Sequence, residues 1–229
     1  LLAFIPEDRR IALAQGRDLP DRTHGAVLFA DISGFTPLTA ALAQELGVQR
    51  GAEEVLNQIN PVYEAIIAEL HHFGGSVMGF AGDSITCWLD GDEGDRGVAC
   101  ALAMQAAMRP FATVLTPAGT PITLAIKVAV SAGPARRFIV GDPDIQFIDV
   151  LAGRTLDHVA SAEKLASKGE VVVGAEVVEF LESKAQVSEW RIAADGERFA
   201  VITGLKDWPD PCPHPPLMEL ELPEEEARR

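Results

Sequence analysis

The sequence has 229 residues, of which 48% are apolar, and it carries 19 Lys and Arg against 34 Asp and Glu. A chain of this length and composition buries one sizeable core, so we expect one large α/β domain. The net charge of -15 argues against electrostatic binding to nucleic acid or anionic lipid, and a nucleotide ligand would need metal ions to offset repulsion. We therefore predict no nucleic-acid partner and no membrane partner.

The cysteines and the ends of the chain indicate its setting. Cys87, Cys100 and Cys212 form neither a C-x-x-C pair nor a disulfide ladder, which is typical of a reducing compartment. No stretch approaches the roughly 20 apolar residues of a membrane-spanning helix, and the short apolar run 1–5 lacks the length and the basic flank of a signal peptide. We predict a soluble, cytoplasmic protein whose three cysteines pack in the core. Because the sequence lacks an initial Met and stops within the charged run 224–229, we expect a fragment of something longer.

The first half of the chain predicts a buried strand, a long helix and a hairpin. Residues 25–30 form a continuous apolar run that places Asp31 at the carboxyl end of a strand covered on both faces. Residues 52–73 carry apolar side chains at helical spacing, and Pro61 either bends this helix or separates two abutting helices. Gly74 and Gly75 end it. A tight turn containing Asp83 then joins the β-compatible runs 76–80 and 84–89.

The second half predicts a series of shorter elements. We expect helices over 98–108, 155–167 and 175–181, and strands over 122–131, 137–140, 146–151, 170–173, 186–192 and 198–203, the last two closing a hairpin around Asp195-Gly196. Five prolines within residues 209–216 exclude a sheet or a helix interior there. We predict a lead-in segment over 1–21, one main domain over 22–205 and a Pro-rich, acidic tail or linker over 206–229.

Two charged features are open to more than one interpretation. The acidic loop from Asp90 to Asp95 fails the spacing of a calcium-binding EF-hand, so we predict a solvated loop that caps a helix. Arg136 and Arg137 could reach ligand phosphates in a dimer groove, but pairing with surface carboxylates is the simpler interpretation.

The segment from Asp31 to Thr36 has the pattern of a phosphate-binding turn. It leaves a buried strand, turns at Gly34 and enters a helix, with Thr36 and Pro37 in the cap and first-turn positions. Free backbone N–H groups at such a helix start hold phosphate oxygens. A nearby carboxylate requires a divalent cation between it and the phosphates, and Mg²⁺ binds one or two carboxylates plus phosphates. Taken singly, each aspartate is more simply interpreted as a turn residue.

Taken together, the strings 29–36, 74–75 and 80–83 resemble the catalytic domain of class III adenylyl and guanylyl cyclases, over about Arg22 to Leu205. The resemblance implies an α+β fold, an α/β sandwich with a ferredoxin-like βαββαβ core whose mixed, mainly antiparallel sheet carries helices on one side. It also implies attack of the ribose 3′-hydroxyl on the α-phosphorus, which releases pyrophosphate.

The resemblance assigns roles to particular residues. Two divalent ions, Mg²⁺ or Mn²⁺, would be ligated by Asp31, the Ile32 carbonyl and Asp83. The nucleotide would be held by residues of the two turns, namely Ile32, Ser33, Gly34, Phe35, Thr36 and Gly82.

Four other positions depart from the family pattern. The family builds each active site between two domains, and the second set comprises a purine-contacting lysine, an Asp or Thr, an Asn and an Arg. In their places stand Gly79, Val150, Asp157 and Ser161, and nearby Asp149 is out of register by one. A homodimer of this chain is possible, but we expect it to be almost inactive.

Three functions therefore remain open. The first is the metal-binding half of a tandem cyclase similar to soluble adenylyl cyclases, making cyclic AMP from ATP with a second cyclase-type domain. The second is a regulatory pseudocyclase that binds metal and triphosphate without turnover. The third, a metal-dependent phosphohydrolase or polymerase-like palm, would not require both sequence strings.

Overall fold

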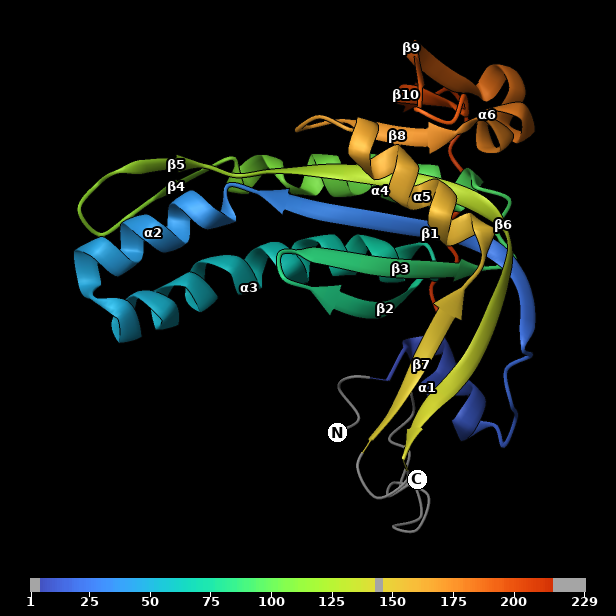
Figure 1. The fold of residues 1–229 in the computed structure, drawn as a ribbon, viewed down its shortest axis with the longest axis horizontal. Helices are drawn as coiled ribbons and strands as arrows, with labels where there is room; N and C mark the ends of the chain where they lie inside the picture. The colour runs from blue at the N-terminus through green and yellow to red at the C-terminus, as the bar shows by residue number, and fades with distance from the viewer. Residues whose placement is uncertain (1–4, 143–145, 216–229) are drawn as a thin grey trace.

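The computed structural model describes residues 5–142 and 146–215. An eight-stranded mixed sheet forms its centre (Figure 1). The strands of this sheet are β1 (Arg22–Ser33), β2 (Ser76–Ala81), β3 (Ser84–Asp90), β6 (Ala125–Asp142), β7 (Gln146–Ala152), β8 (Val171–Gly174), β9 (Ala185–Ile192) and β10 (Arg198–Leu205). A separate hairpin comprises β4 (Thr113–Leu115) and β5 (Pro121–Thr123).

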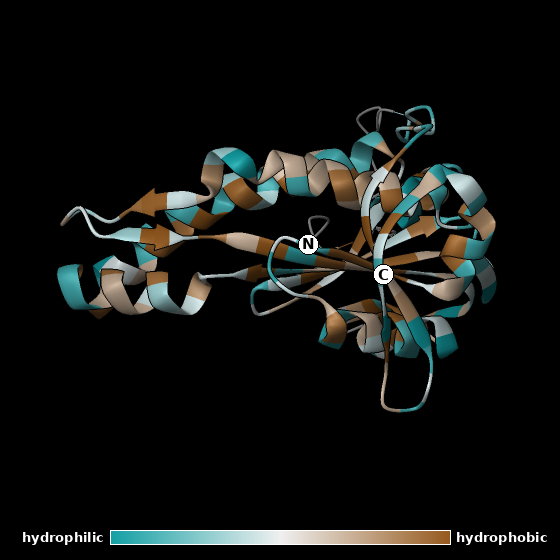
Figure 2. Ribbon diagram, turned by 90° about the horizontal axis from the view of Figure 1, so that it is seen from above, coloured by the Kyte–Doolittle hydropathy of each residue, from teal (hydrophilic) through white to brown (hydrophobic). Residues whose placement is uncertain are grey.

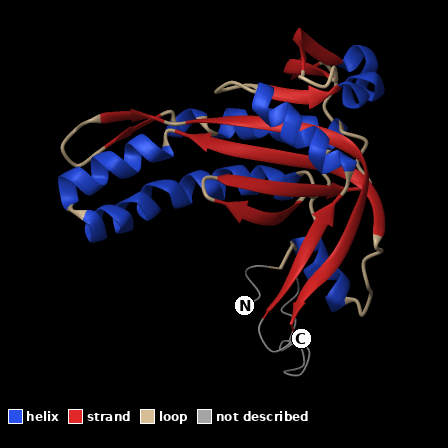
Figure 3. Ribbon diagram, in the orientation of Figure 1, coloured by secondary structure: helices blue, strands red, loops and turns tan. Residues whose placement is uncertain are grey.

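Six α-helices accompany the sheet in the described residues (Figure 3). They are α1 (Glu7–Ala14), α2 (Phe35–Leu46), α3 (Val48–His72), α4 (Asp95–Ala107), α5 (Arg154–Leu165) and α6 (Ala175–Leu181), with short 3₁₀ turns η2 (Arg109–Phe111) and η3 (Glu182–Lys184). None of the described helices is both long enough and apolar enough to span a membrane.

The strand order confirms the ferredoxin-like core. Strands β2, β3, β1 and β6 are neighbours in that order, and each adjacent pair is antiparallel. Helix α3 connects β1 to β2, and α4 connects β3 to the segment before β6, which gives the expected βαββαβ sequence. The sheet is mixed because β8 joins β6 in parallel, while β10 and β9 extend it antiparallel.

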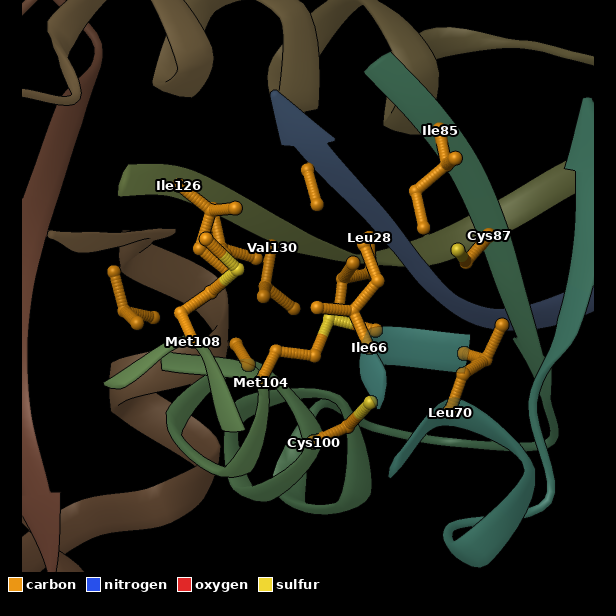
Figure 4. Close-up of a cluster of buried hydrophobic side chains, with 14 of the residues drawn as sticks. Leu28, Ile66, Leu70, Ile85, Cys87, Cys100, Met104, Met108, Ile126 and Val130 are labelled. Atoms are coloured by element: carbon orange, nitrogen blue, oxygen red, sulfur yellow. The ribbon is translucent and has the colours of Figure 1, made fainter. Parts of the chain in front are cut away.

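Helices cover both faces of the sheet, so the expectation of helices on one side is wrong (Figure 2). Alternate residues of β1, such as Leu28, pack into the core with α3 and α4 (Figure 4). The intervening Val27 packs with Val159 and Ala162 of α5 on the opposite face. The continuous apolar run of β1 explains this arrangement, because a strand that is apolar on both sides needs cover on both.

Strand β6 runs through the Gly133-Pro134 step, where two separate strands were expected. Pro134 cannot donate a ladder hydrogen bond, but it is opposite His24 of β1, and the pairing of β6 with β8 involves only Val128 to Val130. At Pro134, β6 therefore has no strand partner on the side of β8, and no donor is needed there. Proline is tolerated in a sheet at such positions. Residues 136–142 of β6 pair with residues 146–152 of β7 in a projecting hairpin, which we call the arm (Figure 1).

Helix α3 continues through Pro61, so of the two alternatives the structure has a single helix. Ile59 and Val62, on either side of the proline, are both buried in the same core. Proline removes one intrahelical hydrogen bond, and the apolar packing on both sides offsets that loss. The acidic loop caps α4 as predicted, since Asp92 accepts from the Gly97 amide at 2.8 Å. Asp90 and Glu93 are exposed as expected, whereas Asp92 itself is buried.

Helix α1 is held against the arm by a buried ion-pair network. Arg137 is 2% exposed, donates from Nη2 to Asp149 Oδ2 at 2.7 Å and pairs with Asp8 of α1. Arg9 donates from Nε to the same Asp149 oxygen at 2.9 Å. The surface interpretation of Arg137 is therefore wrong, whereas Arg136 is exposed.

The segment after β10 lies against the end of α3. The Cys212 amide donates to the His72 carbonyl at 3.1 Å, and no helix or strand forms in residues 206–215. Cys87 and Cys100 are buried as expected, but Cys212 is exposed. The acidic end of the tail and the charged run 224–229 lie outside the described residues.

Candidate active site

The two predicted metal ligands lie at the same corner of the sheet. Asp31 stands two residues before the end of β1, and its partner in β3 is Ser84, the residue after Asp83. The Ile32 amide donates to the Asp83 carbonyl at 3.0 Å, so the β2–β3 turn is attached directly to β1. Gly82, with a φ of +64°, lets this turn close. The backbone thus brings Asp31, Ile32, Gly82 and Asp83 together.

Tyr63 of α3 lies beside both aspartates, which the sequence did not indicate. Its hydroxyl is 3.5 Å from the Gly82 carbonyl oxygen, and its ring meets that of Phe80 edge-on with centroids 5.6 Å apart. Burial, followed by the charges of Asp83 and Asp31, raises the pKa of Tyr63. The charges of both carboxylates act on the same hydroxyl, so both lie near Tyr63. This agrees with the backbone pairing that brings Asp31 and Asp83 together.

The predicted phosphate turn is centred on Gly34. Its φ of +100° is left-handed, and a Cβ there would lie 2.2 Å from the Thr123 carbonyl oxygen of β5, so only glycine fits. Helix α2 begins at Phe35 with Gly34 as its N-cap. Thr36 and Pro37 are therefore the second and third helical residues, and the expected cap role of Thr36 is wrong. First-turn amides, such as those of Phe35 and Thr36, have no intrahelical acceptor and suit an anion.

Lys127 of β6 is a charged residue of this corner that the sequence reasoning missed. It is the cross-strand partner of Asp31, and its Nζ is 3.3 Å from Asp31 Oδ2. The same ammonium pairs with Glu163 of α5. Burial opposes the charge, but contacts with Glu163 and Asp31 raise the pKa of Lys127. A lysine inside the apolar run 125–130 was the available signal, because it implies a buried partner.

The four positions that depart from the family pattern lie on three elements. Gly79 is exposed on β2, where a Cβ would meet no atom within 4 Å. Val150 is in β7 opposite Phe138, and Asp157 and Ser161 are on α5. Among the described residues, no hydrogen bond or ion pair joins any of them to Asp31 or Asp83. These four positions therefore make no polar contact with the two aspartates in the described residues.

Asp149, one residue from the expected purine-contacting position, has a structural role. Its side chain is 4% exposed and is paired with Arg137 and Arg9. Burial opposes ionisation, but hydrogen bonds from Arg137 and Arg9 hold the pKa of Asp149 below its ordinary value. A carboxylate committed to two guanidinium groups is not free to read a purine.

The donor set fits a metal that is completed by substrate. Across the described ranges, no group of three or more His, Cys, Asp or Glu side chains could hold a metal ion by itself. Two carboxylates beside free helix amides suit Mg²⁺, which keeps several waters and takes its other ligands from substrate phosphates. The residues present therefore fit a metal–triphosphate complex better than a stand-alone metal site.

The sequence and the fold both match known cyclases. The sequence model described as the adenylate and guanylate cyclase catalytic domain matches residues 21–202. The chain belongs to this class III cyclase family. Adenylate cyclase type 10 of Homo sapiens is 27% identical over 163 residues, which are 69% of this chain and 10% of that protein. The Mus musculus protein is 24% identical over 150 residues, 65% of this chain and 9% of its own length. The chain thus spans about a tenth of these curated relatives.

Solved cyclase structures share the fold of this class III domain. The guanylyl cyclase Cya2 superposes with a TM-score of 0.67 at 19% identity, over 82% of this chain and 95% of that one. The guanylate cyclase domain of RhGC from Catenaria anguillulae, in complex with GTP, gives 0.66 at 18% identity, over 82% and 100%. The adenylyl cyclase CyaB from P. aeruginosa gives 0.63 at 19% identity, over 82% and 98%. Cyclases of this family act as dimers, bind nucleotides and generally use two divalent metals.

Proposed function

We propose that this chain is the metal-binding half of a purine nucleotidyl cyclase, which converts ATP to cyclic AMP and pyrophosphate when a complementary cyclase domain pairs with it. The observation that carries the proposal is the attachment of the β2–β3 turn to β1. The pairing of Asp31 with Ser84 and the hydrogen bond from Ile32 to Asp83 place two carboxylates at one corner. The same strand leads directly into the Gly34 turn at the start of α2.

In this proposal the chain binds the triphosphate end of ATP. Asp31, the Ile32 carbonyl and Asp83 would hold two divalent metal ions, which supply charge stabilisation for the attacking and leaving oxygens. Amides of the Gly34 turn, from Ser33 to Thr36, and of Gly82 would donate hydrogen bonds to the phosphate oxygens. Metal ions are needed here because the chain carries a net charge of -15.

The complementary domain would supply the base contacts and the transition-state arginine. Gly79 and Val150 offer no polar side chain to a purine, and neither Asp157 nor Ser161 can replace the Asn and Arg. Loss of such an arginine costs about 10³-fold or more in phosphoryl transfer, so a homodimer would be almost inactive. We favour ATP over GTP because the curated relatives are adenylate cyclases.

The arm supports pairing with a second domain. Its end exposes apolar side chains that are 40% to 55% accessible. The strand register puts Phe138, Val140 and Ile148 on one face of the arm and Ile139 and Phe147 on the other. Exposed apolar clusters of this kind mark interaction surfaces, and a cyclase-type domain is the partner expected from the dimers of the family. The cytoplasmic setting predicted from the cysteines belongs to the same proposal.

A regulatory pseudocyclase is the second candidate. It is favoured by the same four positions, because a chain without base-reading and transition-state residues binds the triphosphate without turning it over unless a partner completes the site. Both candidates require Asp31 and Asp83, and they differ in whether the assembled pair makes cyclic AMP.

The test has a binding part and an activity part. Binding of ATP to the full chain should require Mg²⁺ or Mn²⁺, disappear with a chelator and be lost in Asp31→Asn and Asp83→Asn, whereas the exposed Asp157→Asn should bind as wild type. The chain is then mixed with a cyclase domain that carries the lysine, Asp or Thr, Asn and Arg but lacks its own metal aspartates. Cyclic AMP that depends on Asp31 supports the half-site. Metal-dependent binding without cyclic AMP supports the pseudocyclase, and metal-independent binding contradicts both.

A further inference from the structure

We propose that Lys127 is a built-in counter-ion that occupies the metal-ligating Asp31 when no metal is bound, and that Glu163 is the positioning residue that takes over Lys127 when a metal ion arrives. The inference rests on the proposed function, since it concerns the same corner. It adds a residue pair that controls when the corner accepts a cation.

The strand register places Lys127 next to Asp31. The two are direct cross-strand partners in β6 and β1, and such partners have Cβ atoms about 4.5–5.5 Å apart. The ammonium is 3.3 Å from Asp31 Oδ2 and also contacts Glu163 Oε1. All three side chains are between 22% and 24% exposed, so solvent screens these charges only in part.

Repulsion between Asp31 and Asp83 favours the ion pair between Lys127 and Asp31 when no metal ion is bound. Asp31 and Asp83 lie at one corner, and both of their charges act on the Tyr63 hydroxyl. Two carboxylates so placed repel each other unless a cation lies nearby. In the described structure that cation is the ammonium of Lys127, which neutralises Asp31 as a metal ion would.

A metal ion on Asp31 must displace this ammonium, because the two cations would repel each other at the same carboxylate. Lysine can move, since its charge sits on a flexible four-carbon stem. Glu163 on α5 already touches the ammonium, so Lys127 can leave Asp31 without becoming an unpaired, partly buried charge. The two carboxylates therefore compete for one lysine, and the metal affinity of the corner depends on which of them holds it.

This competition predicts opposite effects for neighbouring substitutions. Lys127→Met removes the competing cation and should tighten metal binding by roughly fivefold, the factor that corresponds to about 1 kcal/mol for a partly exposed ion pair. Glu163→Gln leaves Asp31 as the only carboxylate partner of Lys127 and should weaken metal binding several-fold. In a background that already lacks the lysine, Glu163→Gln should have little further effect. A residue that merely supports the fold would not produce opposite signs.

The experiment measures binding of Mn²⁺ to the full chain without nucleotide, from the electron paramagnetic resonance signal of the free ion. Asp31→Asn identifies the component that belongs to this corner, which matters in a chain with 34 acidic residues. Lys164→Met, an exposed lysine on the same helix, is the matched control for loss of one positive charge and should change little. Circular dichroism checks that every variant is folded.

The outcomes separate this inference from the proposed function. Tighter binding in Lys127→Met together with weaker binding in Glu163→Gln supports the counter-ion. If Asp31→Asn removes the Mn²⁺ component while Lys127→Met and Glu163→Gln leave it unchanged, or shift it in the same direction, the counter-ion is wrong and the metal site stands. If Asp31→Asn leaves Mn²⁺ binding unchanged, the metal site fails, and the counter-ion fails with it. Should Lys127→Met or Glu163→Gln not fold, Lys127→Gln or Glu163→Ala removes the same charge and takes its place.

Discussion

Substituting Gly34 tests whether the phosphate turn is built on a close backbone approach. Gly34→Ala introduces a methyl group at a residue with a φ of +100°, and that methyl would lie 2.2 Å from the Thr123 carbonyl oxygen. Gly196→Ala, in the β9–β10 turn, is the matched control, since its φ is +89° and a Cβ there meets no atom within 4 Å. Both variants force alanine into a left-handed conformation, but only Gly34→Ala must also displace backbone.

The expected losses of unfolding free energy follow from two costs, the left-handed backbone conformation in both variants and the close contact with Thr123 in Gly34→Ala alone. A left-handed conformation costs alanine about 1 kcal/mol relative to glycine, which is the whole effect expected for Gly196→Ala. Overpacking against a rigid neighbour adds about 1–3 kcal/mol, so Gly34→Ala should lose about 2–4 kcal/mol of unfolding free energy. Urea unfolding followed by circular dichroism measures both, and metal-dependent ATP binding should weaken in Gly34→Ala alone. Equal destabilisation of the two variants would refute the close approach to Thr123.

Three further predictions concern charged groups. Arg137→Met should lose about 3–5 kcal/mol of unfolding free energy, because it leaves two largely buried carboxylates without this cation. Arg136 is exposed, so Arg136→Met should lose almost none. Chemical unfolding of both variants measures the difference. Burial raises the pKa of Asp92 to about 7, above its unfolded value, so this group makes stability fall as the pH rises from about 4 to about 7. Asp92→Asn should flatten that part of the stability profile, and an unchanged slope would contradict the assignment. Tyr63 is the only tyrosine, so an ultraviolet titration of tyrosinate follows this residue alone. Asp83→Asn should lower the pKa of Tyr63. An unchanged pKa would mean that the Asp83 carboxylate does not lie near the Tyr63 hydroxyl.

Local patterns predicted most of the core elements because each was determined by its own residues. The apolar run 25–30 predicted a strand covered on both faces, and the helical stripe predicted α3. The break expected at Gly133-Pro134 was wrong because a proline forbids a strand only where a ladder donor is needed. Whether a donor is needed depends on the pairing of β6 with its neighbours, and that pairing cannot be derived from residues 133 and 134 themselves.

The candidate site was predictable only in its backbone. The turn at Gly34 and the hairpin around Asp83 have local sequence signals, and the structure brings them together. Tyr63 carries no such signal, since it lies in the stripe of α3. Lys127, inside an apolar run, indicated a buried partner without identifying which residue it is. Their roles follow from the register that sets Lys127 opposite Asp31 and from the packing of α3 against the β2–β3 turn, both of which are tertiary facts.

Under the proposed function, the balance of charge at the corner accounts for the need for a partner domain. Asp31 and Asp83 repel a triphosphate, and the one lysine at the corner in the described residues is shared between Asp31 and Glu163. That lysine can offset one carboxylate, but it leaves none of its charge for the developing negative charge of a transition state. The positions from which the family supplies further polar and cationic groups hold Gly79, Val150 and Ser161 in this chain. The proposed function therefore assigns stabilisation of that charge to metal ions and to residues of the complementary domain, across an interface.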